Sequence, residues 1–220
     1  MTDSAEITTQ DSTLEEWTHA LSRPVGAPGG GAGAGVMLAI AAALTAMVAG
    51  YTETGADQQE DLDRISASAH ELRRIALQLA DEDASASAAF GEAFALERGA
   101  ERDEAIRDAS LGAARSSAVL GEHAIEAIDA LSWLAEHGNR ALIADVVVAF
   151  GALRAAVTGA RTNASFDLAA LRSSGSTLDE VREQHPQLWA TVEELDRAIE
   201  RIDATTTAVD DRAAPTDSHG

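Results

Sequence analysis

The stretch from Gly26 to Tyr51 reads GAPGGGAGAGVMLAIAAALTAMVAGY and decides the fold. No charged residue lies between Arg23 and Glu53. Its many alanines favour a helix, and its small side chains let neighbouring helices approach closely. About 20 apolar residues would suffice for a membrane span, but a run of Ala and Gly with few Leu, Ile or Phe transfers into lipid only marginally. We therefore expect a central, buried bundle helix rather than a membrane span.

The chain of 220 residues is strongly acidic, because 37 acidic residues against 16 basic ones give a formal net charge of −21. Every basic residue is Arg. Non-specific nucleic-acid binding and adsorption to anionic membranes both need a basic surface, so we expect neither partner. The absence of Cys excludes a disulfide scaffold, a thiolate nucleophile and a zinc–thiolate site. No signal-peptide pattern is visible, which favours a cytoplasmic protein.

The rest of the chain predicts further helices. On the segment 57–94, apolar positions alternate by three and four residues, which is typical of bundle packing. Other helices are expected to begin near Ser12 and to cover 103–137, 140–166 and 177–204, with Pro186 either kinking the last helix or marking its true first turn. The predicted class is all-α, a bundle of about five to six helices. We expect one domain over 12–206, a disordered N-terminus over 1–11 and a disordered C-terminal tail over 207–220.

Two carboxylates and the glycines are candidates for chemistry. Asp83 falls where the seam of the long helix expects an apolar residue, so it faces either a pocket or, if the register is slightly different, the surface. Asp145 begins a stripe of small residues that ends at Asn163, and it either serves a site or simply favours the first turn of its helix. Backbone N–H groups at Gly29 to Gly31 suit an anionic or polar ligand. The histidines are scattered without metal-site spacing, so no metal is expected.

Several blocks in order resemble the cyclodeaminase/cyclohydrolase family, which includes the cyclodeaminase domain of formiminotransferase-cyclodeaminase and bacterial methenyltetrahydrofolate cyclohydrolases. The resemblance covers about residues 13 to 205. The blocks that carry it are Thr13-Leu14-Glu15-Glu16-Trp17, Ala27-Pro28-Gly29-Gly30-Gly31-Ala32, Ala46-Met47-Val48-Ala49, Asp81-Glu82-Asp83-Ala84, Gly138-Asn139 with Ile143-Ala144-Asp145, and Leu153-Arg154 with Arg161-Thr162-Asn163.

The resemblance implies an all-helical homodimer that acts on a tetrahydrofolate derivative as substrate, with no permanently bound cofactor. Cyclodeaminases close formimino-tetrahydrofolate to methenyl-tetrahydrofolate with loss of ammonia, as C–N lyases, whereas cyclohydrolases open methenyl-tetrahydrofolate with water. By this analogy Asp83 and Asp145 are the catalytic candidates, one carrying a proton or stabilising charge and the other holding the pterin ring. The implied substrate-binding residues are Pro28, Gly29, Gly30, Gly31, Asn139, Arg154 and Asn163.

The chain also departs from the family pattern. Ala32, Gly50, Ala144 and Gly159 stand where the family has hydroxyl or amide side chains. The segment 53–60 contains no basic residue where the family usually has a run of Lys, although basic groups are the natural partners of the glutamate tail of folate. These losses leave an alternative open, namely a catalytically inactive member of the same fold that acts as a binding or assembly protein.

Overall fold

The computed structural model describes residues 7–24, 26–171 and 177–213, with side chains described up to residue 209 in the last range. Within these ranges the chain forms seven α-helices and one short 3-10 helix and contains no strand. The elements are α1 (Leu14–Leu21), α2 (Gly30–Gly50), α3 (Gln59–Ala95), α4 (Ala100–His137), η1 (Arg140–Leu142), α5 (Ile143–Ala170), α6 (Leu178–Gln184) and α7 (Pro186–Ala213). The predicted all-α class is confirmed, with slightly more helices than the five to six expected.

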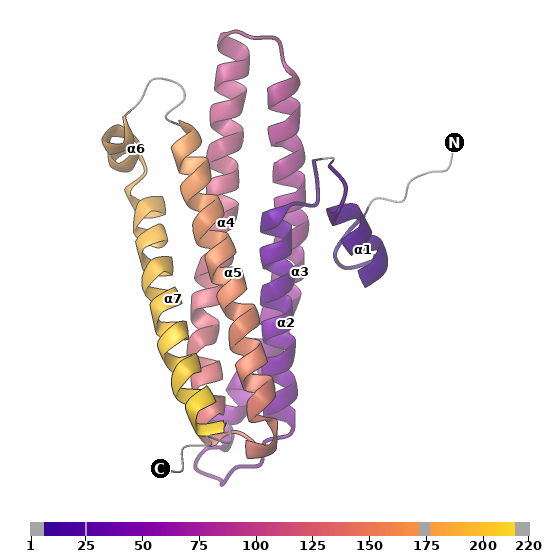
Figure 1. Ribbon diagram of the computed structural model, residues 1–220, viewed down its shortest axis with the longest axis vertical. Helices are drawn as coiled ribbons and strands as arrows, with labels where there is room; N and C mark the ends of the chain where they lie inside the picture. Colours follow the sequence, from indigo (N-terminus) through magenta and orange to yellow (C-terminus); the bar gives the residue numbers. More distant parts are fainter. Residues whose placement is uncertain (1–6, 25, 172–176, 214–220) are drawn as a thin grey trace, which may run out of the picture.

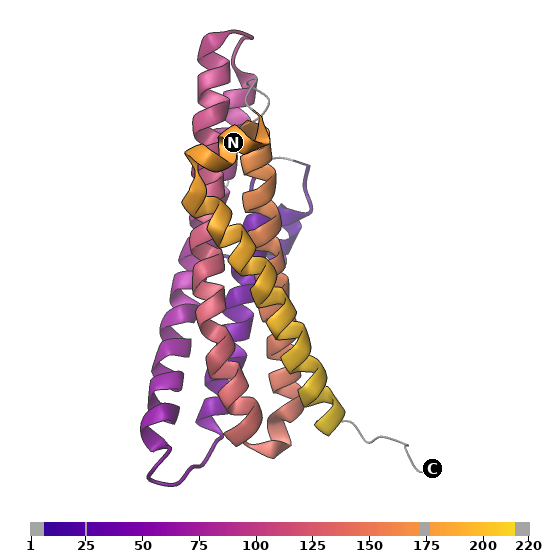
Figure 2. The same ribbon diagram turned by 90° about the vertical axis from the view of Figure 1, so that its left-hand side faces the viewer.

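The long helices α2, α3, α4, α5 and α7 run along the length of one bundle (Figure 1). α2 packs mainly against α3 and α5, while α7 crosses the α4–α5 pair obliquely (Figure 2). Leu38 and Val48 of α2 are fully buried. The Ala- and Gly-rich stretch is therefore the central buried helix that its composition predicts.

Two glycines show how closely the helices approach. A Cβ atom on Gly35 of α2 would lie 2.8 Å from the Cβ of Ala80 and 3.0 Å from the carbonyl oxygen of Ala76, both on α3. A Cβ on Gly159 of α5 would lie 2.8 Å from the Cβ of Ala34 on α2. Real Cβ atoms do not tolerate such distances in a close-packed interior, so glycine is required at both crossings.

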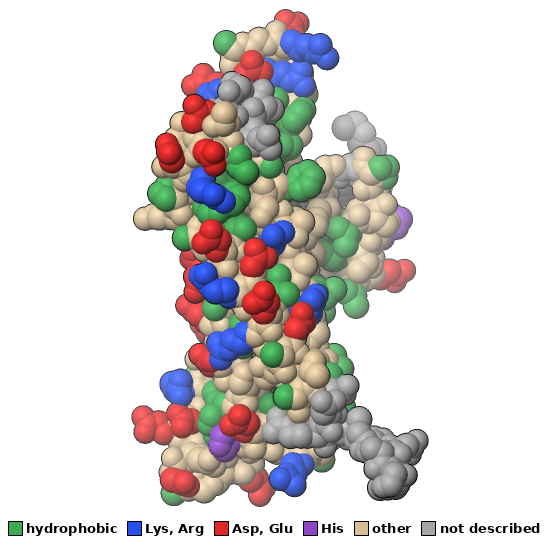
Figure 3. Space-filling model, turned by 60° about the vertical axis from the view of Figure 1, so that its left-hand side comes forward, with side chains coloured by type: hydrophobic (Ala, Val, Ile, Leu, Met, Phe, Trp, Pro, Cys, Tyr) green, Lys and Arg blue, Asp and Glu red, His purple; other side chains and the backbone are tan. Residues whose placement is uncertain are grey.

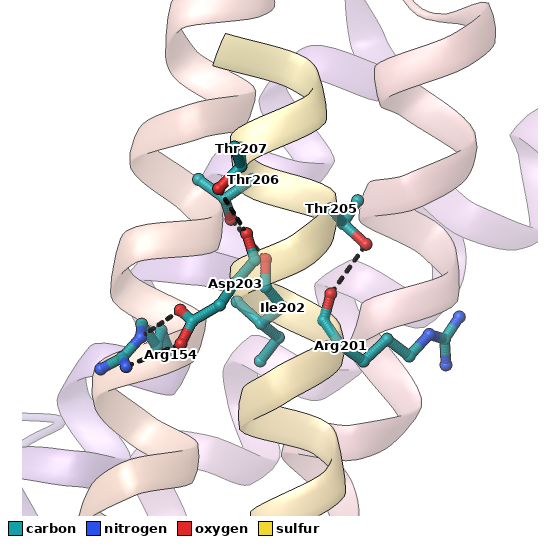
Figure 4. A network of polar contacts seen from close by, with 7 residues as sticks. All are labelled: Arg154, Arg201, Ile202, Asp203, Thr205, Thr206 and Thr207. Carbon is teal, nitrogen blue, oxygen red and sulfur yellow. Dashed lines mark hydrogen bonds and ion pairs between the residues drawn. The ribbon is translucent and has the colours of Figure 1, made fainter. Parts of the chain in front are cut away.

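The described parts of the two end segments, residues 7–11 and 207–213, are more ordered than predicted. In the N-terminal segment, which was expected to be disordered, the backbone N–H of Thr9 donates to the carboxylate of Asp81 at 2.6 Å. This hydrogen bond ties the residues that precede α1 to the helix α3. α7 continues through Ala213, so the tail predicted from residue 207 is wrong over its first seven residues. Val209 is fully buried there, and the hydroxyls of Thr205, Thr206 and Thr207 each donate to the carbonyl one turn earlier (Figure 4).

Pro186 is the first residue of α7 rather than a kink within a longer helix. This agrees with the second of the two roles predicted for it, because the missing N–H of proline has no helical partner in a first turn. α6 is a separate short helix, opened by a capping box in which Thr177 and Glu180 bond each other's backbone N–H groups. α1 begins in the same way, with Thr13 and Glu16.

One side of the bundle is rich in charged pairs. Arg154 and Arg161 on α5 pair with Asp203 and Asp196 on α7, and Arg201 of α7 pairs with Asp129 of α4. The first of these pairs is seen from close by in Figure 4. Figure 3 shows acidic and basic side chains spread along this side of the molecule.

Among the residues that the structure describes, two helices are long and apolar enough to cross a membrane by length and composition alone. They are Gly30–Gly50, with mean hydropathy 2.1, and Arg140–Ala170, with mean hydropathy 1.9. The core helix of a bundle meets the same criteria, and 61% of the α2 window is buried inside the fold. Both helices also present uncharged side chains outward, among them Met37, Ile40, Val148 and Phe166.

Candidate functional site

A cavity of about 460 Å³ lies at the N-terminus of α2, where this helix meets α3, α4 and α5. Three of the predicted site residues that line it are Gly30, Gly31 and Asp83, and a fourth is Asn163. The remaining lining residues are Gly26, Ser87, Phe90, Gly91, Ala113, Ser117, Thr162, Phe166 and Asp167. Segments that are far apart in the sequence therefore share one pocket of the size that small ligands occupy, with a few polar groups in a largely apolar wall.

Asp83 is buried in the seam of α3, with 8% of its surface exposed, so the register that places it in the core is confirmed. Its carboxylate accepts a hydrogen bond from the backbone N–H of Ala32 in the first turn of α2. The N-cap residue Gly29 has no side chain to supply that acceptor, so Asp83 takes its place from the neighbouring helix. Burial raises the pKa of the Asp83 carboxyl, and this hydrogen bond partly opposes the rise.

The glycine run has a separate reason at each position. A Cβ on Gly31 would lie 2.1 Å from an oxygen of Asp83, so only glycine fits beside the buried carboxylate. At Gly30 a Cβ would meet nothing within 4 Å, and at Gly29 the nearest atom would be Ser87 Oγ at 3.9 Å. Close approach of α2 to Asp83 therefore rests on Gly31. Gly30 also lines the cavity, whereas Gly29, although predicted to bind substrate, is not among its lining residues.

A second acidic residue in the cavity, Asp167, was missed by the sequence analysis. It lies one turn beyond Asn163 on α5, and this four-residue spacing is the signal that could have indicated it. Burial, together with the neighbouring charge of Asp83, raises the pKa of Asp167 to about 6. The site thus brings together two carboxyl groups that hold protons more strongly than ordinary aspartates.

Hydroxyl and aromatic groups complete the cavity wall. Ser117 of α4 is only 4% exposed, and its hydroxyl makes no hydrogen bond to any residue that the structure describes. Phe90 lies beside Phe94 with the ring centroids 4.9 Å apart, and Phe166 is 78% exposed at the rim. An aromatic rim over a polar floor suits a flat heterocyclic ligand.

A neighbouring cavity of about 540 Å³ lies on the other side of the loop that precedes α2, between this loop, α1 and α3. Pro28 lines this cavity, together with Arg23, Asp81 and Glu92. Among the described residues that line the two cavities, Arg23 is the one cation. Pro28 is therefore close to the glycines in sequence, but it faces a different hollow.

The structure places two predicted residues at the other end of the bundle. Asn139 bonds the loop after α2, where its Nδ2 donates to the carbonyl of Tyr51 at 2.9 Å. Asp145 lies in the first turn of α5, six residues after Asn139. α2 has 21 residues, so its two ends lie about 30 Å apart at a rise of about 1.5 Å per residue. Within one chain, Asn139 and Asp145 are therefore remote from Asp83.

Arg154 is also outside the cavity. Its Nε and Nη2 donate to the two carboxylate oxygens of Asp203 at 2.5 and 2.9 Å. This pairing joins α5 to α7 on the charged side of the bundle. Among the residues that the structure describes, no three His, Asp or Glu side chains gather in a manner that could hold a metal ion.

Comparison with known proteins agrees with the family resemblance and with the all-helical fold. A family model for formiminotransferase-cyclodeaminase matches residues 13–185. The methenyltetrahydrofolate cyclohydrolase of Methylorubrum extorquens AM1 is 28% identical over 166 residues, which cover 70% of this chain and 80% of that protein. The crystal structure of the formiminotetrahydrofolate cyclodeaminase of Thermotoga maritima has a TM-score of 0.74 and 23% identity, over 92% of this chain and 96% of its own. At that identity the structural likeness shows the fold alone.

Proposed function

The chain belongs to the formiminotransferase-cyclodeaminase family, and from this premise we propose that it hydrolyses the one-carbon bridge of a methenyl-tetrahydrofolate. The observation that carries the proposal is the cavity at the N-terminus of α2, where Asp83 and Asn163 meet. The relative whose sequence aligns over 70% of this chain is named a cyclohydrolase, which favours this reaction over ammonia release.

The chemistry follows from the charges involved. A methenyl bridge between two nitrogens is cationic, and attack by water converts it to a tetrahedral carbon while a proton leaves. Carboxylates in a partly buried site stabilise the cation and accept that proton, tasks for which a raised pKa is suitable. Asp83 fits this part because it is buried, lines the cavity and carries a carboxyl whose pKa burial raises. Asn163 offers an amide that can both donate to and accept from the ring of the pterin.

The decisive measurement is the loss of absorbance of the methenyl-tetrahydrofolate chromophore above the spontaneous rate. We expect turnover by the wild-type protein and at most residual turnover by Asp83→Asn, since the amide cannot accept the proton. Asp63→Asn is the matched control, because it makes the same change at an exposed residue of α3 that lies 20 residues before Asp83, about 30 Å away. Equal activity in the wild-type and Asp83→Asn proteins would contradict the assignment.

A second measurement separates the enzyme from the alternative of an inactive binding or assembly protein. Isothermal titration with folates that carry one or several glutamates would detect binding without turnover. The tail needs a cation, and Arg23 is the one that lines the cavities. Arg23→Gln is expected to weaken binding of the longer tail more than that of the shorter one. No folate binding at millimolar concentration would leave the non-enzymatic alternative.

We also propose that two copies of this chain pair through the outward faces of α2 and α5. The α2 face is formed by Met37, Ile40, Leu44 and Met47, and the α5 face by Ala144, Val148, Gly151, Ala155, Thr162 and Phe166. Neither face carries a charge, although the whole chain has a net charge of −21. Exposed apolar patches of this extent mark interaction surfaces.

A lipid bilayer is a poorer occupant of this uncharged face than a second copy. The ion pairs Arg154–Asp203 and Arg161–Asp196 lie on the same helix α5. In a membrane-spanning bundle their charges would enter the hydrocarbon layer, which is costly. Light scattering is expected to give twice the chain mass, and Val148→Arg is expected to give the single-chain mass. Val119→Arg changes an equally apolar exposed residue on α4 and serves as the control; dissociation by both variants would argue against this face.

A further inference from the structure

The cavity contains two carboxyl groups, but the second is Asp167 rather than the Asp145 that the family resemblance suggested. Asp83 of α3 and Asp167 of α5 both line it, and the charge of Asp83 acts on the carboxyl of Asp167. Among the described lining residues, α2 and α4 contribute no titratable side chain, and α3 and α5 contribute only these two. No cation therefore lines the cavity to compensate a second negative charge.

The cavity is also arranged as a binding site rather than as a chance meeting of acids. Ser117 is more than nine-tenths buried, lines the cavity beside Asp83, and its hydroxyl has no hydrogen-bond partner among the described residues. A hydroxyl that faces a cavity without a protein partner is available to bond a polar ligand atom. Ser117 thus independently indicates a polar ligand atom in contact with both the hydroxyl and the carboxyl groups.

We propose that Asp83 and Asp167 form a proton-sharing pair that moves both protons of the hydrolytic reaction. The pair begins with one proton and accepts a second from the water that attacks the methenyl carbon, so that the cation becomes a neutral tetrahedral adduct. It then donates a proton to the departing folate nitrogen as the carbon–nitrogen bond breaks, and takes the hydroxyl proton of the adduct as the carbonyl forms. Release of one proton to solvent restores the starting state.

Two neighbouring carboxyl groups cannot both ionise freely, so their protons leave in two separate steps that belong to the pair. Burial raises the pKa of Asp83, and the pKa of Asp167 is raised to about 6, so one of these steps lies within reach of neutral pH. A group whose pKa lies near the working pH is the most efficient proton carrier. This catalytic part of the inference rests on the proposed function, whereas the pairing itself does not.

The first arm of the test needs no substrate. In full-length protein labelled with carbon-13 at the carboxyl of aspartate, the signal lost in Asp167→Asn identifies Asp167, and its titration is followed by NMR. We expect Asp83→Asn to lower the pKa of Asp167, since a neighbouring negative charge has been removed. Asp63→Asn, about 30 Å from Asp83 on the same helix, should leave that pKa unchanged. Independent titration of Asp83 and Asp167 would overturn the pair.

The second arm is the dependence of methenyl-tetrahydrofolate turnover on pH. Asp167→Asn is expected to lower kcat by about 100-fold or more and to remove one limb of the pH–rate profile. Asp167→Glu should retain both limbs, because it restores the carboxyl group. A variant Asp167→Asn with the wild-type profile would overturn the catalytic use of the pair. A wild-type protein that binds folate but has no turnover would refute the proposed function and that use, while the NMR titration would still decide the pairing.

Discussion

Replacement of Gly35 by Ala tests the close packing of α2 on α3 that positions the cavity. The added Cβ would lie 2.8 Å from the Cβ of Ala80 and 3.0 Å from the carbonyl oxygen of Ala76. Both alanines are fully buried, and one of the two contacts is with backbone, so relief requires the two helices to move apart. Asp83 follows Ala80 by less than one turn, and the same movement would displace it from the first turn of α2.

The magnitude is the difference between two opposing effects. Ala is better than Gly inside a helix by about 1 kcal/mol. Overpacking of a rigid core costs about 1–3 kcal/mol, and contact with backbone places this site at the upper end. We therefore expect Gly35→Ala to lower the free energy of unfolding by about 2 kcal/mol. Gly112→Ala on α4 is the control, since a Cβ there meets nothing within 4 Å, and it should stabilise by about 0.5–1 kcal/mol.

Urea and thermal unfolding, followed by circular dichroism at one fixed protein concentration, measure both variants. For a chain of this length 1 kcal/mol corresponds to about 2–4 °C in Tm. Gly35→Ala should thus lose about 4–8 °C while Gly112→Ala gains about 1–4 °C. If Gly35→Ala were as stable as Gly112→Ala, α2 and α3 could not approach as closely as described, and the account of the cavity would fail with it.

Three further predictions concern charged groups. Asp167→Asn should stabilise the protein above about pH 6 and have no effect below about pH 3, because the raised pKa of Asp167 in the folded state makes its ionisation destabilising. The shift of this pKa from 3.8 to about 6 corresponds to about 3 kcal/mol for a buried group, and partial exposure reduces the effect to about 1–2 kcal/mol. Urea unfolding of both proteins across this pH range measures the difference. Arg161→Gln should destabilise by about 0.5 kcal/mol, a loss that concentrated salt removes in thermal melts. Pairing through the α2 and α5 faces can bring the Asp145 end of one copy to the cavity of the other. In that arrangement, mixing Asp83→Asn subunits with Asp145→Asn subunits should recover about a quarter of wild-type turnover. An active Asp145→Asn protein would contradict it.

The features that the sequence predicted correctly are those that repeat within one helix. The three- and four-residue alternation along α3 placed Asp83 in the core because an apolar seam and an interrupting carboxylate share one helical register. The uncharged run before Tyr51 predicted a buried helix because it contains no charged side chain that would favour exposure to water. Both inferences depend on contacts between residues near in sequence and on their periodicity.

The features that sequence reasoning missed depend on which helix ends meet. Asp167 lay beyond the residue where the helix was expected to stop, so its position one turn after Asn163 was not considered. Asn139 and Asp145 belong to a motif block that resembles the family, but antiparallel connections bring this block to the far end of α2. The tail from residue 207 was predicted as irregular because it lacks an apolar rhythm, although the hydroxyl of Thr207 bonds the helix backbone and Val209 is buried.

Asp83 has two functions that a single substitution can separate. Its carboxylate accepts the N–H of Ala32 and so completes the first turn of α2, which has no side-chain cap of its own. In Asp83→Asn the amide oxygen can still accept this hydrogen bond, so the turn is retained while the charge and the proton are lost. In Asp83→Ala the acceptor is lost as well, at a cost of about 1 kcal/mol or more for an unpaired buried N–H. A protein that loses turnover in both variants but stability mainly in Asp83→Ala would show that the carboxylate holds α2 through its oxygen and acts on substrate through its charge.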